Sequence, residues 1–201
     1  MSARDDILGR VRTALASVQP DPVPVASPRA APSGDLVDLF AERVADYRAT
    51  VVHCPADGVE VAVAAALPAG ARVVVPPALP AGLVAGLDVV VDEGLSATEL
   101  DRVDAVVTGC RVAIAETGTI VLDHEPDQGR RAITLVPDRH VCIVRADQVV
   151  ADVPDALAVL DPSRPLTWIS GPSATSDIEL DRVEGVHGPR ALHVIVVDAP
   201  I

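Results

Sequence analysis

Apolar residues near the start of the chain recur at helical spacing. The apolar positions that share one helical face are Ile7, Leu8, Val11, Leu15 and Val18. Ser2 followed three residues later by Asp5 is typical of a helix start. Prolines are then dense between residues 20 and 33, where neither a helix nor a central strand can form. The pattern predicts an amphipathic helix over residues 1–19, a stiff Pro-rich linker over 20–33 and a folded domain over 34–201.

From residue 34 onward, helical patterns alternate with short apolar runs. Ser33 is a candidate cap for a helix that carries Leu36 to Tyr47, and Ser96 with Glu99 resembles a capping box for another. Further helices are expected at 59–67 and near Ala81. The runs expected as strands are 50–53, 72–75, 88–91 and 104–107. Strands that alternate with helices favour right-handed crossovers and a mostly parallel sheet.

The pattern changes after residue 110. Two β-rich runs, 111–116 and 119–123, are joined by Thr117 and Gly118, which indicates a hairpin insertion. Strands are expected at 132–136, 140–144, 166–170 and 192–197, and a helix at 152–160. The predicted fold is therefore α/β, with an open, mostly parallel sheet, helices on both faces and a β-hairpin insertion.

Composition excludes several classes of function. The chain contains no lysine, which removes Schiff-base chemistry, lysine-anchored pyridoxal phosphate and Walker-type phosphate loops. A formal charge of −13 disfavours nucleic-acid partners. The apolar runs are shorter than a membrane span needs, and residues 1–19 lack the pattern of a signal peptide, so a cytoplasmic protein is expected. Cys54, Cys110 and Cys142 are too widely spaced for an iron–sulfur or zinc site, and no cofactor or metal is expected.

Polar residues at the hairpin turn form the first candidate site. Glu116, Thr117, Gly118 and Thr119 combine a carboxylate, two hydroxyls and a flexible backbone at a tight turn. Backbone N–H groups and hydroxyls could converge there on an anion, and Glu116 could act as a base or nucleophile. The alternative is an ordinary hairpin turn without a ligand.

A second polar segment follows the expected strand at 166–170. Its candidate ligand-binding residues are Ser170, Gly171, Ser173, Thr175 and Asp177. Loops after strands are where open α/β sheets bind ligands, and these hydroxyls could hold an anion. The alternative is a capped helix start, in which Ser176 and Glu179 form a capping box.

The third segment places His187 between glycines just before the last expected strand. An imidazole in this position could carry a proton or donate a hydrogen bond to a carboxylate, although a solvated loop histidine remains the alternative. We expect the three segments to converge at the carboxyl ends of the strands, with Glu116 and His187 as candidate catalytic residues.

The three segments together, in this order, resemble the signature of the LUD-domain (lactate utilisation) family. The likeness is most specific from Arg111 to Val197, and the first helix and linker are similar to those of the small LutC group, which lacks cysteine-rich extensions. This resemblance implies a fold similar to the NagB/RpiA/CoA-transferase group. It also implies a non-redox role beside two iron–sulfur subunits that oxidise L-lactate to pyruvate.

Two other functions stay open at this point. A free-standing enzyme of the CoA-transferase or sugar-phosphate-isomerase type would use Glu116 as its nucleophile or base. A binding module would instead recognise a small anionic metabolite that bears a carboxylate or a phosphate.

Overall fold

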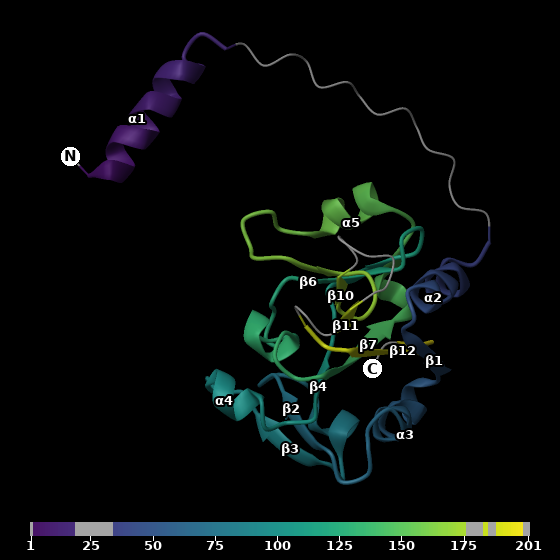
Figure 1. Cartoon of the computed structure of the whole chain (residues 1–201). Helices are drawn as coiled ribbons and strands as arrows, with labels where there is room; N and C mark the ends of the chain where they lie inside the picture. Colours follow the sequence, from purple (N-terminus) through teal and green to yellow (C-terminus); the bar gives the residue numbers. More distant parts are fainter. Residues whose placement is uncertain (1, 19–33, 176–182, 185–187, 199–201) are drawn as a thin grey trace. The chain divides into compact units, whose positions relative to one another are not determined.

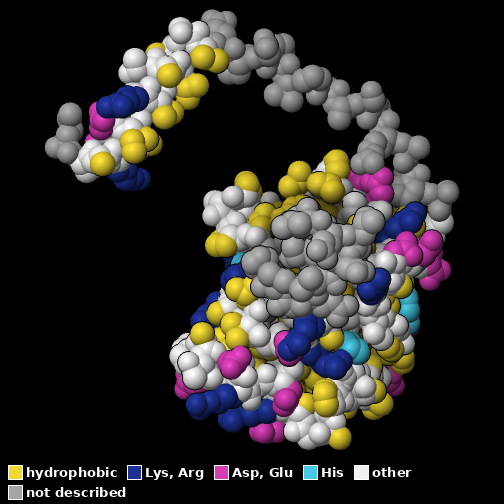
Figure 2. All heavy atoms as spheres, in the orientation of Figure 1, with side chains coloured by type: hydrophobic (Ala, Val, Ile, Leu, Met, Phe, Trp, Pro, Cys, Tyr) yellow, Lys and Arg dark blue, Asp and Glu magenta, His cyan; other side chains and the backbone are white. Residues whose placement is uncertain are grey.

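The computed structural model describes residues 2–18, 34–175, 183–184 and 188–198 (Figure 1). Residues 1–31 and 32–201 form two separate compact units. In the first unit, α1 spans Ala3–Leu15, and Ser2 and Asp5 form the expected capping box. None of the α1 residues is buried, and apolar side chains run along one side of the helix (Figure 2). The amphipathic helix predicted from the sequence is therefore present.

The helices of the second unit are short. They are α2 (Leu36–Asp46), α3 (Val59–Ala65), α4 (Ala97–Leu100) and α5 (Val153–Val159), with 3₁₀ turns η1 (Ala56–Gly58), η2 (Ala81–Val84), η3 (Arg131–Thr134) and η4 (Ala146–Gln148). The expected capping box of Ser96 and Glu99 starts α4. At α2 the cap is Asp35, whose side chain accepts hydrogen bonds from the backbone of Val37 and Asp38. The expected cap Ser33 lies outside the described residues.

Six parallel strands form the central sheet. Its members are β1 (Thr50–Cys54), β2 (Arg72–Val75), β3 (Asp88–Val91), β4 (Ala105–Thr108), β7 (Arg139–Arg145) and β12 (Ala191–Val197), in the order β1-β12-β7-β4-β2-β3. Every pairing in this sheet is parallel, and the last strand inserts between β1 and β7. Valine and isoleucine suit these strands because their branched side chains pack well on a sheet covered on both faces.

A second sheet contains the expected hairpin. Its order is β8 (Val149–Val150), β5 (Val112–Ile114), β6 (Thr119–Leu122) and β9 (Thr167–Ile169), with β5 and β6 antiparallel. A separate short pair joins β10 (Ala174–Thr175) to β11 (Val183–Glu184). The strand expected at 132–136 is wrong, because the chain turns there as η3. The backbone N–H of Ile133 donates to Arg130, and the Ile133 side chain is buried against Leu100 and Val106.

Helices lie on both faces of the parallel sheet, as the sequence predicted (Figure 1). On one face, α3 and η2 pack on Val73, Val107 and Ile195. On the other face, α2 and the second sheet cover Val144 and Val194, while α4 and η3 cover Val74 and Val106. The outer face of the second sheet packs on α5. Because the six strands are parallel, their amino ends meet at one edge of the sheet and their carboxyl ends at the other.

Candidate functional site

The hairpin turn and the segment after β9 meet in the structure. Ile120 of β6 pairs with Ile169 of β9, so the residues beyond this pair, Thr119 and Ser170, are neighbours. Their hydroxyl oxygens are 2.8 Å apart, and the Thr117 hydroxyl donates to that of Thr119 over the same distance. Two of the three polar segments therefore share one edge of the second sheet and are linked by hydroxyl groups.

The glycines of these two segments allow α2 to pack closely. Gly118 has a φ of 59°, and a Cβ there would lie 2.7 Å from the Arg43 backbone. Gly171 has a φ of 89°, and its Cβ would lie 2.6 Å from the Cβ of Tyr47. Both positions combine the left-handed region with contacts that no side chain would fit. The two glycines thus fix the second sheet against the end of α2.

A cavity of about 230 Å³ lies beside the segment after β9. Ser170, Gly171 and Ser173 form one of its walls, and Gly188 and Pro189 contribute to the rim. The backbone N–H of Ser173 donates to the Pro189 carbonyl at 2.9 Å, which ties this wall to the start of β12. Three residues predicted from the sequence therefore line one cavity.

Arg131, Thr134 and His140 also line the cavity. His140 is 1% exposed, and its Nε2 is 2.8 Å from the Thr108 hydroxyl oxygen. Burial, reinforced by the positive charge of Arg131, lowers the pKa of His140 to about 4. At neutral pH the imidazole is therefore uncharged and can donate or accept a hydrogen bond, while Arg131 supplies the positive charge.

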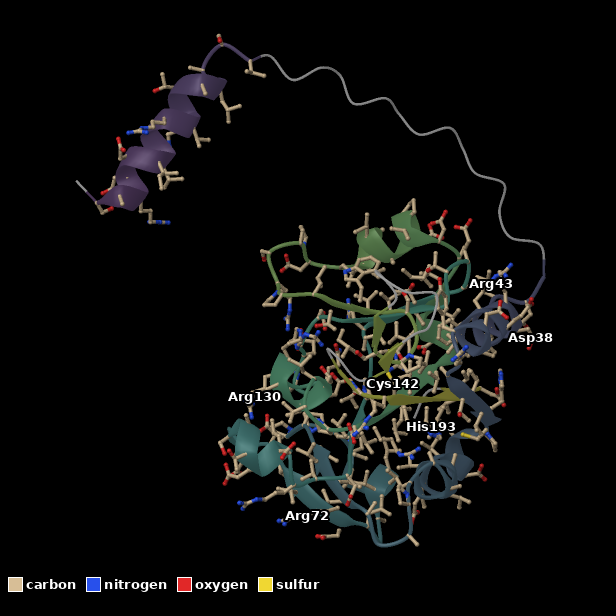
Figure 3. The ribbon with its side chains drawn as sticks, viewed as in Figure 1. Asp38, Arg43, Arg72, Arg130, Cys142 and His193 are labelled. Carbon is tan, nitrogen blue, oxygen red and sulfur yellow. The ribbon has the colours of Figure 1, made fainter. Side chains whose placement is uncertain are left out.

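Arg131 follows a residue that is firmly anchored. Arg130 donates from Nε and Nη2 to the two carboxylate oxygens of Asp92, at 2.7 and 2.8 Å. This bidentate hydrogen bonding lowers the pKa of Asp92, and it holds the start of η3 next to α4, where Figure 3 shows Arg130. Neither Arg131 nor His140 was among the site residues predicted from the sequence. The signals available were a histidine at the start of the apolar run 140–144 and a pair of adjacent arginines, Arg130 and Arg131, earlier in the chain.

The cavity does not lie at the carboxyl ends of the parallel strands, where the sequence predicted the site. His140 and Leu192 both line it, and each is the second residue of its strand, β7 or β12. The cavity is thus at the amino edge of the parallel sheet instead of the expected carboxyl edge. Ser170 does follow the carboxyl end of a strand. That strand is β9, which belongs to the second sheet and not to the parallel sheet.

The other predicted residues have different surroundings. Glu116 and Thr117 line a separate, more open recess with Arg43, Asp46 and Tyr47. Thr175 is in β10, and only its backbone is described. His187 and Asp177, like the helix start considered at Ser176, lie outside the described residues. The described residues therefore bring together Thr119, Ser170, Gly171 and Ser173, with Glu116 and Thr117 near them on another surface.

Within residues 2–18, 34–175, 183–184 and 188–198, no three histidine, cysteine, aspartate or glutamate side chains are grouped so that they could hold a metal ion. Cys54, Cys110 and Cys142 are buried free thiols. Among the same residues, no helix has both the length and the apolar character to cross a bilayer.

Known proteins resemble this chain over about half of its length or more. "Lactate utilization protein C" of Deinococcus radiodurans is 50% identical, over 97% of this chain and 95% of that protein. A protein of the same name from Bacillus subtilis is 32% identical over 49% of this chain and 44% of its own length. The crystal structure of a DUF162 family protein from D. radiodurans matches with a TM-score of 0.70 and 46% identity, over 81% of this chain and 96% of that one.

The family model described as LUD domain matches residues 38–197, which include both sheets and the cavity between η3 and the segment after β9. The match leaves out α1 and covers most of the second unit. The chain therefore belongs to the LUD-domain family.

Proposed function

We propose that this protein serves lactate utilisation as a cluster-free component that binds a small carboxylate, L-lactate or pyruvate, in the cavity lined by Arg131, His140 and Ser170. The observation that carries the proposal is this combination of one cation, one buried neutral imidazole and neighbouring hydroxyls. A relative that is 50% identical and named for lactate utilisation supports the choice of ligand.

The chemistry of the cavity suits a hydroxy acid or keto acid. The guanidinium of Arg131 can form charge-assisted hydrogen bonds with a carboxylate. Neutral His140 can pair with the 2-hydroxyl or 2-keto oxygen, and Ser170 supplies a further hydroxyl. A phosphate would be a competing ligand, because it also accepts hydrogen bonds from arginine and hydroxyl groups.

The oxidation itself needs an electron acceptor. The described residues contain no clustered ligands for a metal centre, and the sequence has no dinucleotide fingerprint. We propose that iron–sulfur partner subunits carry the electrons, with this chain binding substrate or product beside them. The protein would work in the cytoplasm, where lactate is available to such a complex.

The CoA-transferase or isomerase alternative is less well supported by the site. Its nucleophile, Glu116, lines the recess beside Arg43 and Tyr47 instead of the cavity with the arginine and histidine. Glu116 also already interacts with other groups of the protein. No observation in this region favours a covalent intermediate over simple binding.

Trp168 allows a direct test of binding, because it lines the cavity and is the only tryptophan. Titration of the full-length protein with L-lactate or pyruvate should change its fluorescence, and Arg131→Gln should weaken the binding at least tenfold, which corresponds to about 1.4 kcal/mol. Arg43→Gln, in the other recess, is the matched control and should bind like the wild type. Unchanged fluorescence with both acids, or unaltered affinity in Arg131→Gln, would refute the binding proposal.

The role in a complex needs a separate experiment. The chain should be co-purified with iron–sulfur proteins encoded by neighbouring genes, and lactate-dependent dye reduction measured with and without it. We expect the activity to fall when the chain is omitted and to return when it is added back. Full activity of the partners alone would rule out a supporting role.

A further inference from the structure

A second cavity, of about 170 Å³, lies at the opposite edge of the parallel sheet. Its lining comes from the segments that follow β2 and β4 and from the end of β7, with Leu79, Gly109 and Arg145 as representatives. All of these segments adjoin carboxyl ends of parallel strands, and Asp127, from the segment after β6 of the second sheet, completes the lining. We call this cavity the carboxyl-edge crevice.

The crevice coincides with a change in the direction of chain winding. From β2 the chain proceeds outward to β3 at the edge of the sheet, whereas from β4 it proceeds the other way to β7. The loops after β2 and β4 therefore diverge to opposite faces and leave a gap between them. Open α/β sheets bind ligands at such a switch point.

One wall of the crevice is apolar and one is polar. Leu79, Leu83 and Ile143 are buried residues of the core cluster that supply the apolar wall. Asp127 and Arg145 supply opposite charges on the polar wall. Few convergent polar groups on an apolar background are typical of sites for small organic molecules.

The position of Asp127 depends on a glycine. The backbone N–H of Gly109 donates to the Asp127 carbonyl at 3.1 Å, and a Cβ on Gly109 would lie 2.7 Å from the Asp127 carboxylate oxygen Oδ2. Burial, together with the charges of Asp123 and Glu125, raises the pKa of Asp127. This carboxyl group accepts a hydrogen bond from Nε2 of Gln128 at 3.3 Å, and it would gain from a further donor, most from a positively charged one.

Gln148 fixes the other part of the polar wall. Its Nε2 donates to the Cys110 carbonyl at 2.6 Å, and its Oε1 accepts from the Arg145 backbone N–H at 3.0 Å. Behind it, the Cys142 thiol, which Figure 3 labels inside the sheet, donates to the Gly109 carbonyl at 3.7 Å. The backbone at the ends of β4 and β7 is thereby held in place before any ligand arrives.

The Arg145 guanidinium retains capacity for a ligand. It donates from Nε to Asp147 at 2.9 Å and from Nη2 to the same carboxylate at 3.4 Å. Its Nη1 makes no hydrogen bond to any residue among those the structure describes. An incoming carboxylate could therefore bind Arg145 without first displacing Asp147.

We propose that the carboxyl-edge crevice binds a small aliphatic carboxylic acid that carries a hydrogen-bond donor next to its carboxylate. The carboxylate faces Arg145, the ammonium or hydroxyl donor faces Asp127, and the aliphatic group contacts Leu79, Leu83 and Ile143. Both α-amino acids and longer α-hydroxy acids have this chemistry. The inference is independent of the cavity lined by Arg131 and His140, which lies at the amino edge of the sheet and is called the amino-edge cavity below.

Isoleucine methyl groups make the two sites distinguishable by NMR. Ile143 lines the crevice, whereas Ile169 lines the amino-edge cavity. With isoleucine δ1 methyl groups labelled in the full-length chain, L-leucine or 2-hydroxy-4-methylpentanoate should shift the Ile143 signal and leave that of Ile169 in place. The acid that shifts Ile143 at the lower concentration identifies the preferred donor.

Two analogues test the individual contacts. 4-Methylpentanoate lacks the donor and 3-methylbutylamine lacks the carboxylate, so each should bind at least tenfold more weakly than the better of the two acids. An Ile143 shift with 4-methylpentanoate at equal affinity would overturn the proposed contact with Asp127. No shift with any of the four compounds would overturn the site itself.

Variants provide the second test. Asp127→Asn and Arg145→Gln should each weaken binding at least tenfold, while the controls Asp88→Asn and Arg72→Gln, at exposed positions of β3 and β2, should leave it unchanged. Thermal unfolding checks that each variant is folded. If Asp127→Asn does not fold, Arg145→Gln alone is sufficient to test the proposal. Wild-type affinity in a folded Arg145→Gln variant would contradict the proposal, whatever the outcome of the lactate titration.

Discussion

Each of the two edges of the parallel sheet has a cavity lined by an arginine and by a second titratable residue, but the second residue differs. At the amino edge, Arg131 lines a cavity with the buried His140, and at the carboxyl edge Arg145 lines a cavity with Asp127. Burial favours the neutral form in both places, since it lowers the pKa of the histidine and raises that of the aspartate. Each edge thus combines an arginine with a partner whose charge is disfavoured.

The edges differ in how they are assembled. The carboxyl-edge crevice is formed mainly by segments that directly follow strands of a single sheet. The amino-edge cavity needs the second sheet as well, because residues 168–173, at and after the end of β9, line it together with residues of β7 and β12. A site assembled from two sheets depends on tertiary packing, so mutations at that packing surface should affect the amino edge first.

The largest effect is expected from Gly171→Ala. The substitution places a Cβ 2.6 Å from Tyr47 and forces a side chain into the left-handed region at φ 89°. Together these should lower the free energy of unfolding by about 3 kcal/mol or more. Denaturant unfolding measures the loss. The control is Gly94→Ala, where φ is also positive but no atom lies within 4 Å, and where only about 1–2 kcal/mol should be lost.

A comparable loss in the two glycine variants would show that backbone strain alone decides the cost. The contact between the second sheet and α2 would then not be what holds the amino-edge cavity together. A much larger loss at Gly171 would show the reverse.

A somewhat smaller effect is expected from acid. The folded-state pKa of His140, about 4, is below its ordinary value of 6.5, so the unfolded chain binds the proton first. Stability from this residue is fully present above pH 6.5 and is lost as the pH falls toward 4. The loss should approach about 3 kcal/mol. His140→Gln should remove most of this slope in denaturant unfolding between pH 4 and 6.5.

Other groups contribute to the pH dependence as well. Burial and the charge of Arg139 lower the pKa of His193 from 6.5, so His193 adds to the slope in the same pH range in both the wild type and His140→Gln. The pKa of Asp92 is lowered from 3.8 by Arg130, so its contribution is lost only below that value. His53→Gln, at an exposed strand position, is the control and should keep the wild-type slope. An unchanged slope in His140→Gln would mean that this imidazole is not held neutral, and the account of the amino-edge cavity would need a charged histidine.

Much of the fold could be predicted from local signals. Capping at Ser2 and Ser96, the alternation of valine-rich runs with helices and the hairpin around Gly118 each gave the correct element. The strand expected at 132–136 failed because an apolar run around Ile133 suits a strand and a buried 3₁₀ turn equally well. Periodicity cannot separate these two when the run is short.

The lining of the amino-edge cavity could be predicted only in part. Ser170, Gly171 and Ser173 were candidates because glycine and hydroxyl residues cluster after a strand, and they line this cavity. Their edge was placed wrongly, since the sequence does not reveal that β9 joins a different sheet from β7. Arg131 and His140 were missed because they reach the cavity through tertiary contacts of η3 and β7. For the same reason Glu116, next to the correct turn, lines another surface.

The smallest effect is expected from removal of residues 1–32. Both cavities are lined by residues from 78 onward, and α1 has no buried residue of its own. The free energy of unfolding of the remaining chain should therefore change by less than about 0.5 kcal/mol, and both ligand titrations should be unaltered. Such a result would fit a role of α1 in the full-length chain in which its apolar face, with Ile7, Val11 and Leu15 exposed, binds a partner subunit. A truncated chain that loses cooperative unfolding, or loses the Trp168 response alone, would show instead that the helix supports the amino edge.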